Sequence, residues 1–225
     1  MMFTMINLVN LKKRRIRKIS YRQGGLQVSK GNRKLGADTL ILNMGSALRC
    51  PSKKLGLCEV ADKCYARKAE VLYPNVLPYR RRQQLYWLQN DAGKIIEDFD
   101  KLLKRFRNIS EIKYLRFNES GDFFSQNCVE KMSEISKFLQ EEYSIITYGY
   151  TARTDLDFEN AHFLVKGSGK AKGNNGRTVV VNKKEAEKFY SQKRFKEQWI
   201  ICPTDCRQCI ICKKQNGINV IFKLH

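Results

Sequence analysis

The sequence predicts an α/β fold in which a parallel sheet of six strands curves into a partial barrel. Short apolar segments rich in β-branched residues alternate with longer segments of helical periodicity through the middle of the chain. This alternation is typical of parallel sheets connected by helices. Cysteine-rich loops follow the first and the last of the expected strands. Because α/β proteins gather their chemistry at the carboxyl edge of the sheet, both loops are expected to share one face.

The first half of the chain contains two expected strands and four expected helices. Strands are predicted where short runs such as TLILNM are apolar, and helices where apolar residues recur every three to four positions. The expected strands are Thr39–Met44 and Ile112–Asn118, and the expected helices are Glu59–Leu72, Leu77–Asn90, a segment around Ile95–Phe106, and Ser125–Glu142.

The second half contains four further expected strands and one helix. Asn182 is predicted to cap the helix, because Glu185 three residues later completes a capping-box pattern. The expected strands are Ser144–Tyr150, His162–Lys166, Thr178–Val181 and Gln198–Cys202, and the helix is Lys183–Glu197. With 225 residues, 42% of them hydrophobic, we expect a single domain over residues 39–225 preceded by a basic segment, residues 1–38.

Four cysteines near the end, Cys202, Cys206, Cys209 and Cys212, form a C-x3-C-x2-C-x2-C run. Disulfides need Cα atoms about 4.4 to 6.8 Å apart, so thiols this crowded would form mainly strained small rings. Structural zinc usually takes its ligands as two separated pairs, whereas iron–sulfur clusters accept a run of this kind. The run therefore favours iron–sulfur, and a structural zinc site stays open as the alternative.

Three earlier cysteines, Cys50, Cys58 and Cys64, have the spacing C-x7-C-x5-C. A four-iron cluster held by three cysteines leaves one iron free for water, substrate or cofactor, whereas a four-cysteine cluster is closed. Seven thiolates thus match one open and one closed [4Fe–4S] cluster, although one shared cluster is also open. Cys128 falls on the apolar face of a predicted helix and is expected in the core.

The chain has 43 lysines and arginines against 22 acidic residues, a net charge of +21. Such an excess predicts binding to polyanions, and nucleic acid is the expected partner. A solvated basic face is the alternative for any single run of charges. Recognised nucleic-acid modules are absent from the sequence, so no sequence-specific reading is expected.

A membrane span is not expected, because no run of about 18 apolar residues is present. The opening apolar stretch is followed rather than preceded by its positive charges, which is the wrong order for a secretory signal. Clustered reduced thiols favour the cytoplasm.

Polar residues and glycines follow the middle strands. As catalytic candidates we select Glu119, Asp122, Tyr148 and Arg153, and as cofactor-binding candidates Asn118, Gly121, Gly167, Ser168 and Gly169. The carboxylates, phenol and guanidinium could orient a substrate or handle protons, and each could equally be a helix cap or an ion pair. The glycines could let backbone amides approach an anion, and a mobile basic loop is the alternative.

Five motifs, in order along the chain, resemble the phage protein family called gene product 88. They are CPSKKLGLC with KCYARK, YPNVLPYRRRQ, LRFNESGDF, YGYTAR and CPTDCRQCIIC, and they extend from about Thr39 to Cys212. The resemblance implies a virus-encoded protein that acts in the cytoplasm of an infected host cell.

A broader resemblance is to radical S-adenosylmethionine (SAM) enzymes, which have a partial (βα)6, TIM-like barrel. In those enzymes a three-cysteine loop follows the first strand and a motif with glycine and glutamate follows the second. Cys50, Cys58 and Cys64 and then Asn118–Asp122 occupy similar places here. The resemblance implies a [4Fe–4S] cluster on the three cysteines, with Glu119 or a neighbour facing the ligand of the open iron.

The cysteine spacing departs from that of radical SAM enzymes, which use C-x3-C-x2-C with an aromatic residue before the last cysteine. Here the spacing is C-x7-C-x5-C and Lys63 takes the aromatic position, so the binding of SAM stays open. Two hypotheses follow. The first is an iron–sulfur protein with redox or radical chemistry on or near nucleic acid, and the second is a non-catalytic nucleic-acid-binding protein with structural metal sites.

Overall fold

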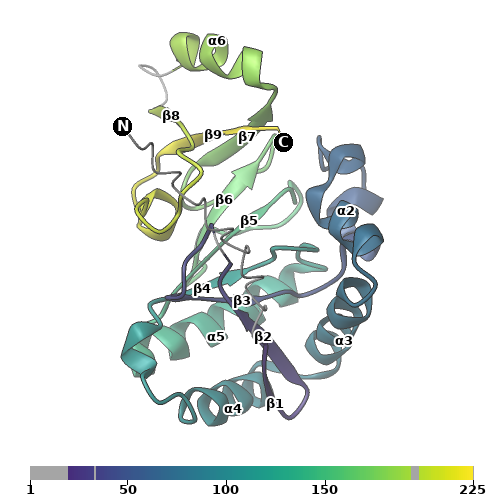
Figure 1. Ribbon diagram of the computed structural model, residues 1–225, viewed down its shortest axis with the longest axis vertical. Coiled ribbons are helices and arrows are strands. Elements are labelled where there is room, and N and C mark those ends of the chain that lie inside the picture. Colours follow the sequence, from purple (N-terminus) through teal and green to yellow (C-terminus); the bar gives the residue numbers. More distant parts are fainter. Residues whose placement is uncertain (1–19, 33, 194–197, 225) are drawn as a thin grey trace, which may run out of the picture.

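The computed structural model describes residues 20–32, 34–193 and 198–224. These residues form a nine-stranded mixed sheet in the order β1-β2-β3-β4-β5-β6-β7-β9-β8, which is open because its edge strands β1 and β8 do not pair (Figure 1). The strands are β1 (Ser20–Gln23), β2 (Leu26–Lys30), β3 (Thr39–Leu42), β4 (Tyr114–Phe117), β5 (Ile146–Thr151), β6 (Leu164–Ser168), β7 (Arg177–Val181), β8 (Trp199–Ile201) and β9 (Asn219–Lys223). The predicted α/β class is confirmed.

All six predicted strands are present, as β3 to β8, but the sheet has three more. β9 lies between β7 and β8, so the parallel part has seven strands rather than six. An antiparallel hairpin of β1 and β2 joins the sheet beside β3. This hairpin belongs to the basic segment expected before the domain, and Gly24, with φ +55°, forms its turn.

The helices observed are α1 (Pro51–Lys54), α2 (Tyr65–Leu72), α3 (Val76–Gln89), α4 (Ala92–Leu103), α5 (Gln126–Tyr143) and α6 (Lys183–Lys193). The helix predicted over Glu59–Leu72 begins only at Tyr65, after a 3-10 turn over Ala61–Lys63. The predicted capping box of α6 is confirmed, since the Glu185 amide donates to the Asn182 side chain at 2.9 Å and the Asn182 amide donates to Glu185 at 3.3 Å.

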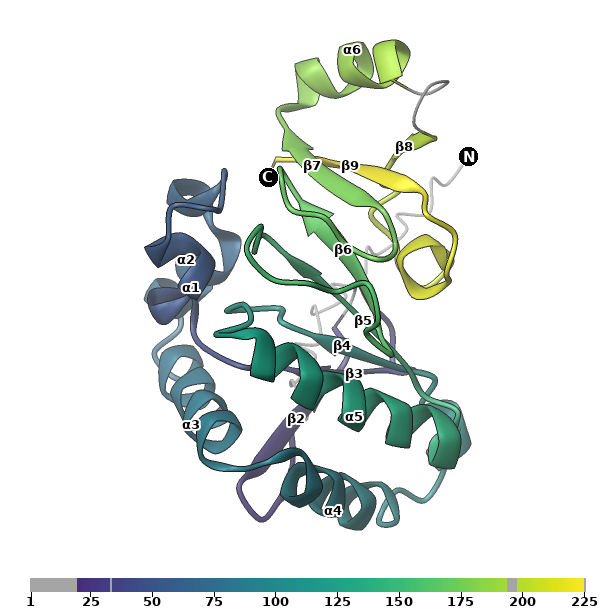
Figure 2. The ribbon, with the colours of Figure 1, turned by 180° about the vertical axis from the view of Figure 1, so that it is seen from behind.

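Most of the helices cover one face of the sheet, which we call the helix face. Figure 2 shows α5 and α4 across the first parallel strands, with α3 beside them and α6 at the far end beyond β7. Leu115 and Phe117 of β4 are fully buried against this layer together with Met132 and Ile135 of α5. Cys128 packs in the same core, as its helical position predicts.

Side chains that alternate with these core residues point to the opposite face, which we call the cysteine face. It presents Arg116 of β4, Tyr148 and Tyr150 of β5, Ser168 of β6, Thr178 of β7 and Phe222 of β9. Successive side chains of a strand point to opposite faces, so the apolar core and this largely polar surface are two sides of the same strands.

The handedness of the crossovers explains which connection lies on the cysteine face. From β3 to β8 each new strand is added farther along the sheet in the same direction, and the helical crossovers lie on the helix face. The connection from β8 to β9 runs in the opposite direction, because β9 lies between β7 and β8. Connections between parallel strands are nearly always right-handed, so a reversal of direction puts the connection on the other face. This connection, residues 202–218, contains the four late cysteines, and its 3-10 turn (Ile211–Lys213) packs on β5 and β6.

Candidate functional site

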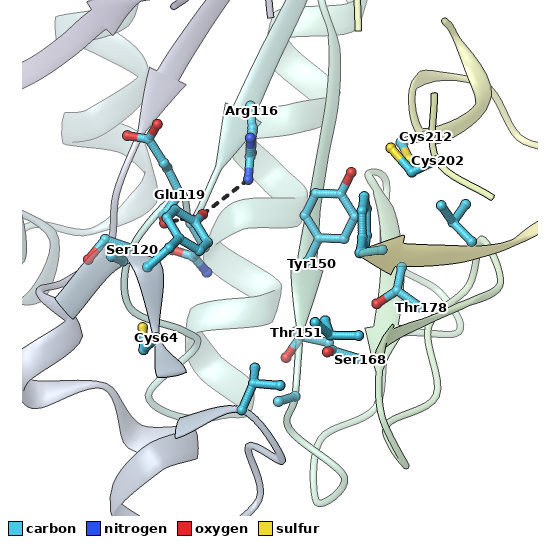
Figure 3. A pocket seen from close by; sticks show the side chains of 18 of the residues that line it. Cys64, Arg116, Glu119, Ser120, Tyr150, Thr151, Ser168, Thr178, Cys202 and Cys212 are labelled. Carbon is cyan, nitrogen blue, oxygen red and sulfur yellow. Dashed lines mark hydrogen bonds between the residues drawn. The ribbon is translucent and has the colours of Figure 1, made fainter. Parts of the chain in front are cut away.

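A cavity of about 470 Å³ lies on the cysteine face, between the loop after β3 and the loop after β8. All seven cysteines predicted as metal ligands line it: Cys50, Cys58, Cys64, Cys202, Cys206, Cys209 and Cys212. We call the first three the front cysteines and the last four the rear cysteines. In Figure 3 the front Cys64 and the rear Cys202 and Cys212 lie on opposite sides of Arg116 and Tyr150.

The rear loop is held across the cysteine face by backbone and lysine contacts. The Cys206 amide donates to the Lys34 carbonyl at 3.0 Å, which ties the loop to the segment after β2. Lys213 is buried, donates to the Cys206 carbonyl at 3.0 Å, and lies 4.2 Å from the centre of the Tyr114 ring. The rear cysteines therefore lie over the middle of the sheet and not only at its edge.

Cations lie near two of the rear cysteines, Cys206 and Cys212. Burial raises the pKa of Cys206, and the positive charges of Lys34, Arg116 and Lys213 oppose that shift. Burial also raises the pKa of Cys212, while a hydrogen bond from the Tyr150 hydroxyl and the charge of Lys166 oppose it. Because these groups favour thiolate over thiol, the site suits a ligand set with several negative sulfurs.

Lys166 of β6 is unusual because its ammonium group is buried. It is 1% exposed, and its Nζ donates to the carbonyl oxygens of Asn175 at 2.5 Å and Ile218 at 2.6 Å. Burial lowers the pKa of Lys166, and the neighbouring Cys212 opposes that shift. This lysine ties β6 to the end of the rear loop, where β9 begins.

The front loop is fixed at its start by a buried carboxylate. Glu70 of α2 accepts the backbone amides of Ala47 at 2.7 Å and Leu48 at 3.0 Å, and it pairs with Arg80 of α3 at 3.1 Å. Arg80 also donates to the Ala66 carbonyl at 2.8 Å. Of the arginines at the start of α3, Arg80 therefore has a structural role, since it holds α2 and the start of the front loop in place.

Asp122 connects three segments around the front cysteines. One carboxylate oxygen accepts the Ser52 hydroxyl at 2.6 Å and the Ala152 amide at 2.9 Å. The other accepts the Thr151 hydroxyl and the Phe123 amide, both at 2.8 Å. Asp122 therefore ties α1, inside the front loop, to the loop after β4 and the end of β5.

The front cysteines have a different electrostatic environment from the rear ones. Burial raises the pKa of Cys50 to about 12, and the negative charge of Asp122 adds to the shift. Burial raises the pKa of Cys58 as well, with the amide of Val60 opposing and Cys64 and Asp122 adding. Without a metal, Cys50 and Cys58 are therefore held in the neutral form.

The donor chemistry of the cavity fits a thiophilic metal. Soft thiolate ligands select zinc and iron–sulfur clusters over hard cations. The front loop brings three cysteines to the cavity and the rear loop brings four. Among the residues that the structure describes, no three histidine, cysteine or acidic side chains already meet as a metal site. A bound metal would therefore draw the sulfurs of each group together.

Residues 12–217 match the family model described as gene product 88. The chain belongs to this phage protein family. The resemblance identified from the five motifs is thereby confirmed. A search of curated proteins and a search of solved structures both find no match. None of the helices in the described part of this gene product 88 protein is long and apolar enough to cross a membrane.

Two of the four catalytic candidates of this gene product 88 protein are carboxylates that line the cavity. Glu119 accepts the Asn32 side-chain amide at 3.2 Å and lies 3.9 Å from Arg80. Asp122 lines the cavity too, but hydrogen-bond donors surround both of its oxygens. Glu119 is therefore the better placed of the two to meet a ligand.

The other two catalytic candidates differ in position. Tyr148 is 2% exposed and lines the cavity, and its hydroxyl has no hydrogen-bond partner among the described residues. Arg153 instead pairs with Asp155 through two hydrogen bonds of 2.7 Å and donates to the Phe123 carbonyl. Arg153 thus lies outside the cavity lining, and its contacts are those of a structural ion pair.

Among the cofactor-binding candidates, Asn118, Gly121 and Ser168 line the cavity. Packing explains Gly121, because with φ +78° an added Cβ would lie 2.8 Å from the Gly45 carbonyl oxygen. Packing also explains Gly167, whose added Cβ would lie 2.0 Å from the Ala171 carbonyl oxygen. Gly169, with φ +63°, lies against the Glu59 carboxylate of the front loop. The glycine-rich segment is a close-packed turn between β6 and β7.

Arg116, Tyr150 and Tyr65 line the cavity but were not among the selected candidates, although Tyr150 belongs to the same predicted strand as the candidate Tyr148. Arg116 lies 5.3 Å from the centre of the Tyr150 ring, and its guanidinium donates to the Tyr65 hydroxyl at 3.4 Å. The missed signal was the alternation of polar and apolar residues in Tyr114–Phe117, which places Arg116 opposite the core.

Proposed function

We propose that this gene product 88 protein is an iron–sulfur protein that performs redox or radical chemistry on a ligand in the cavity. In this proposal the front cysteines hold a [4Fe–4S] cluster with one iron open to the cavity. The rear cysteines hold a second, closed cluster. The observation that supports it is the convergence of seven cysteines, from loops about 140 positions apart, on one cavity.

The two environments favour different roles. Cations near Cys206 and Cys212 would compensate part of the negative charge of a four-thiolate cluster, which would raise its reduction potential and suit electron transfer. The front cysteines share the cavity with Glu119, and the neutral Tyr148 hydroxyl lies near the rear Cys206 and Cys212. Glu119 and Tyr148 could orient a ligand or hold a proton near it. A bound cluster would supply the electron, and these side chains would position the ligand.

The finer assignment of the fold to a radical-SAM-like partial barrel is part of the proposal. In support, the front cysteines follow β3, the first parallel strand, and Glu119 follows β4, the second. The sheet is open, as a partial barrel requires. SAM is then a candidate ligand of the front cluster, with the unusual cysteine spacing as the main difference.

Metal and sulfide analysis of anaerobically purified protein tests the proposal. We expect about eight iron and eight sulfide per chain for two four-iron clusters, with absorbance near 400 nm. The Cys58→Ala variant should lose about half of the iron, while Cys128→Ala, which changes a core cysteine outside the cavity lining, should keep all of it. Stoichiometric zinc in colourless protein would reject the iron–sulfur assignment.

Reductive cleavage of SAM tests the radical variant separately. Reduced, cluster-loaded protein is incubated with SAM, and 5′-deoxyadenosine is measured beside a control enzyme. Cleavage that depends on Cys58 supports a radical SAM enzyme. If no cleavage occurs while iron and sulfide are present, the radical variant fails and the iron–sulfur assignment stands.

The second candidate function is a non-catalytic nucleic-acid-binding protein with structural metal sites. The net charge of +21 favours it, and exposed basic residues such as Arg81 and Arg82 of α3 supply part of that charge. Binding of this kind should weaken steeply as salt is added, because lysine and arginine displace condensed counterions. Affinity that is independent of salt would reject it. Either function would operate in the cytoplasm of the infected cell.

A further inference from the structure

The cavity has a cationic wall in which most charges make no ion pair within the described part of the chain. Its lining includes five such residues, Lys34, Lys53, Lys63, Arg116 and Lys213, and also Lys223, which pairs with Glu187 at 3.3 Å. The carboxylates of the lining are those of Glu119, Asp122 and Asp205. Those carboxylates already have partners: Asp122 has its hydrogen-bond donors, Glu119 has Asn32 and Arg80, and Asp205 has Arg207. The uncompensated charge that faces the cavity is therefore positive.

Two buried donors in the cavity also lack acceptors. The Nε of Arg116 and the hydroxyl of Tyr148 are buried and make no hydrogen bond among the described residues. Both side chains belong to the cysteine face, on the neighbouring strands β4 and β5, and residues 116 and 148 are register partners. Buried donors without acceptors are rare because each costs about 1 to 3 kcal/mol. Their pairing at one place indicates a site for an oxyanion.

Next to these donors the cavity wall is aromatic and aliphatic. Tyr150 and Phe222 meet edge to face with ring centres 5.7 Å apart, and Val180 and Val220 extend the surface along β7 and β9. Arg116 lies against the Tyr150 ring, so the cationic and aromatic walls meet. An aromatic surface of this kind suits a flat ring, which can stack on it.

We infer that the cavity binds a small ligand with an oxyanion head and a flat aromatic body, for which a nucleoside monophosphate is the fitting class. Arg116 and Tyr148 receive the oxyanion, and the wall of Tyr150 and Phe222 receives the base. Arginine favours phosphate because its guanidinium offers paired donors. Only the role of this ligand as a substrate rests on the proposed function, since binding needs no cluster.

Calorimetric titration of the purified protein with AMP tests the inference. Two comparison ligands are adenosine, which lacks the oxyanion head, and inorganic phosphate, which lacks the aromatic body. AMP should bind, and adenosine should bind at least about tenfold more weakly because Arg116 and Tyr148 then keep no acceptor. Adenosine binding as tightly as AMP would overturn the oxyanion site. Phosphate should compete with AMP at high concentration, and failure to compete would also count against the site.

Variants locate the binding. Arg116→Gln should weaken AMP binding about tenfold or more. Tyr148→Phe should weaken it about threefold, and this variant should stay folded because it loses only a hydroxyl that has no partner in the described structure. Arg81→Gln, on the exposed surface of α3, should bind AMP like the parent protein. Unchanged AMP affinity in both cavity variants would overturn the inference.

Metal analysis of the same samples separates this inference from the proposed function. If AMP binding depends on Arg116 but the protein contains no iron or sulfide, the ligand site is supported and the iron–sulfur assignment is contradicted. If the protein contains clusters but does not bind AMP, the iron–sulfur assignment is supported and the inferred ligand site is contradicted. Replacing AMP by benzoate or another aromatic carboxylate distinguishes a carboxylate head from a phosphate head.

Discussion

Removal of the Asp122 carboxylate should destabilise the protein because it frees the front loop from the sheet. In Asp122→Ala the amides of Phe123 and Ala152 lose their acceptor inside the protein. Each buried amide left without a partner costs about 1 to 3 kcal/mol, so the free energy of unfolding should fall by about 4 kcal/mol. Ser52→Ala removes a single donor at 2.6 Å and should cost about 2 kcal/mol.

Urea unfolding of reduced, metal-free protein, followed by circular dichroism, measures these changes. Asp62→Ala is the matched control, since Asp62 lies in the same loop but is exposed, and it should change the free energy of unfolding by less than about 0.5 kcal/mol. A loss below about 1 kcal/mol in Asp122→Ala would refute the view that Asp122 holds the front loop.

Three other predictions concern the thiols, a glycine and the buried lysine. The pKa of Cys50 is about 12 instead of the ordinary 9.0, so at pH 8 Cys50 should contain about a thousandfold less thiolate than an unperturbed cysteine. Alkylation of Cys50, followed by mass spectrometry, should therefore be slow and should become about tenfold faster for each unit of pH. Since the unfolded thiol ionises first, metal-free protein should lose stability as the pH rises from about 9 towards 12; constant stability over that range would contradict the shift. Gly167→Ala should lower the free energy of unfolding by about 3 kcal/mol because of the close Ala171 carbonyl, whereas Gly93→Ala, in helix α4 with 3.6 Å to its nearest contact, should be neutral or stabilising. Equal effects of the two would contradict the packing explanation. Lys166→Met should cost about 2 to 4 kcal/mol in thermal unfolding, since two carbonyl oxygens lose their donor, and an unchanged melting temperature would contradict this.

The predicted elements succeeded where local sequence decides the structure. β3, β4 and α5 begin and end within two residues of their predicted bounds. The largest differences are that β4 begins at Tyr114 instead of Ile112 and β3 ends at Leu42 instead of Met44. The capping box of α6 was also predictable, because its two partners are three residues apart. Periodicity and caps depend on neighbours along the chain.

Strands with mixed composition were missed. β1 and β2 contain polar residues because they form the end of the sheet, and the Gly24–Gly25 turn between them was the available signal. β9 lies directly after the rear cysteine loop, and its pairing with both β7 and β8 is a long-range event. Pairing of this kind depends on the whole sheet and leaves little trace in a short window of sequence.

The sequence by itself determined the seven grouped cysteines, the positive charge and the α/β class, because residue type, spacing and periodicity are local properties. Only the tertiary structure decided which side chains meet in the cavity. The reversal of chain direction between β8 and β9 put the rear cysteines on the cysteine face, and the register of β4 with β5 put Arg116 beside Tyr148. These contacts join residues far apart in the chain, and they form only when the strands are ordered and paired.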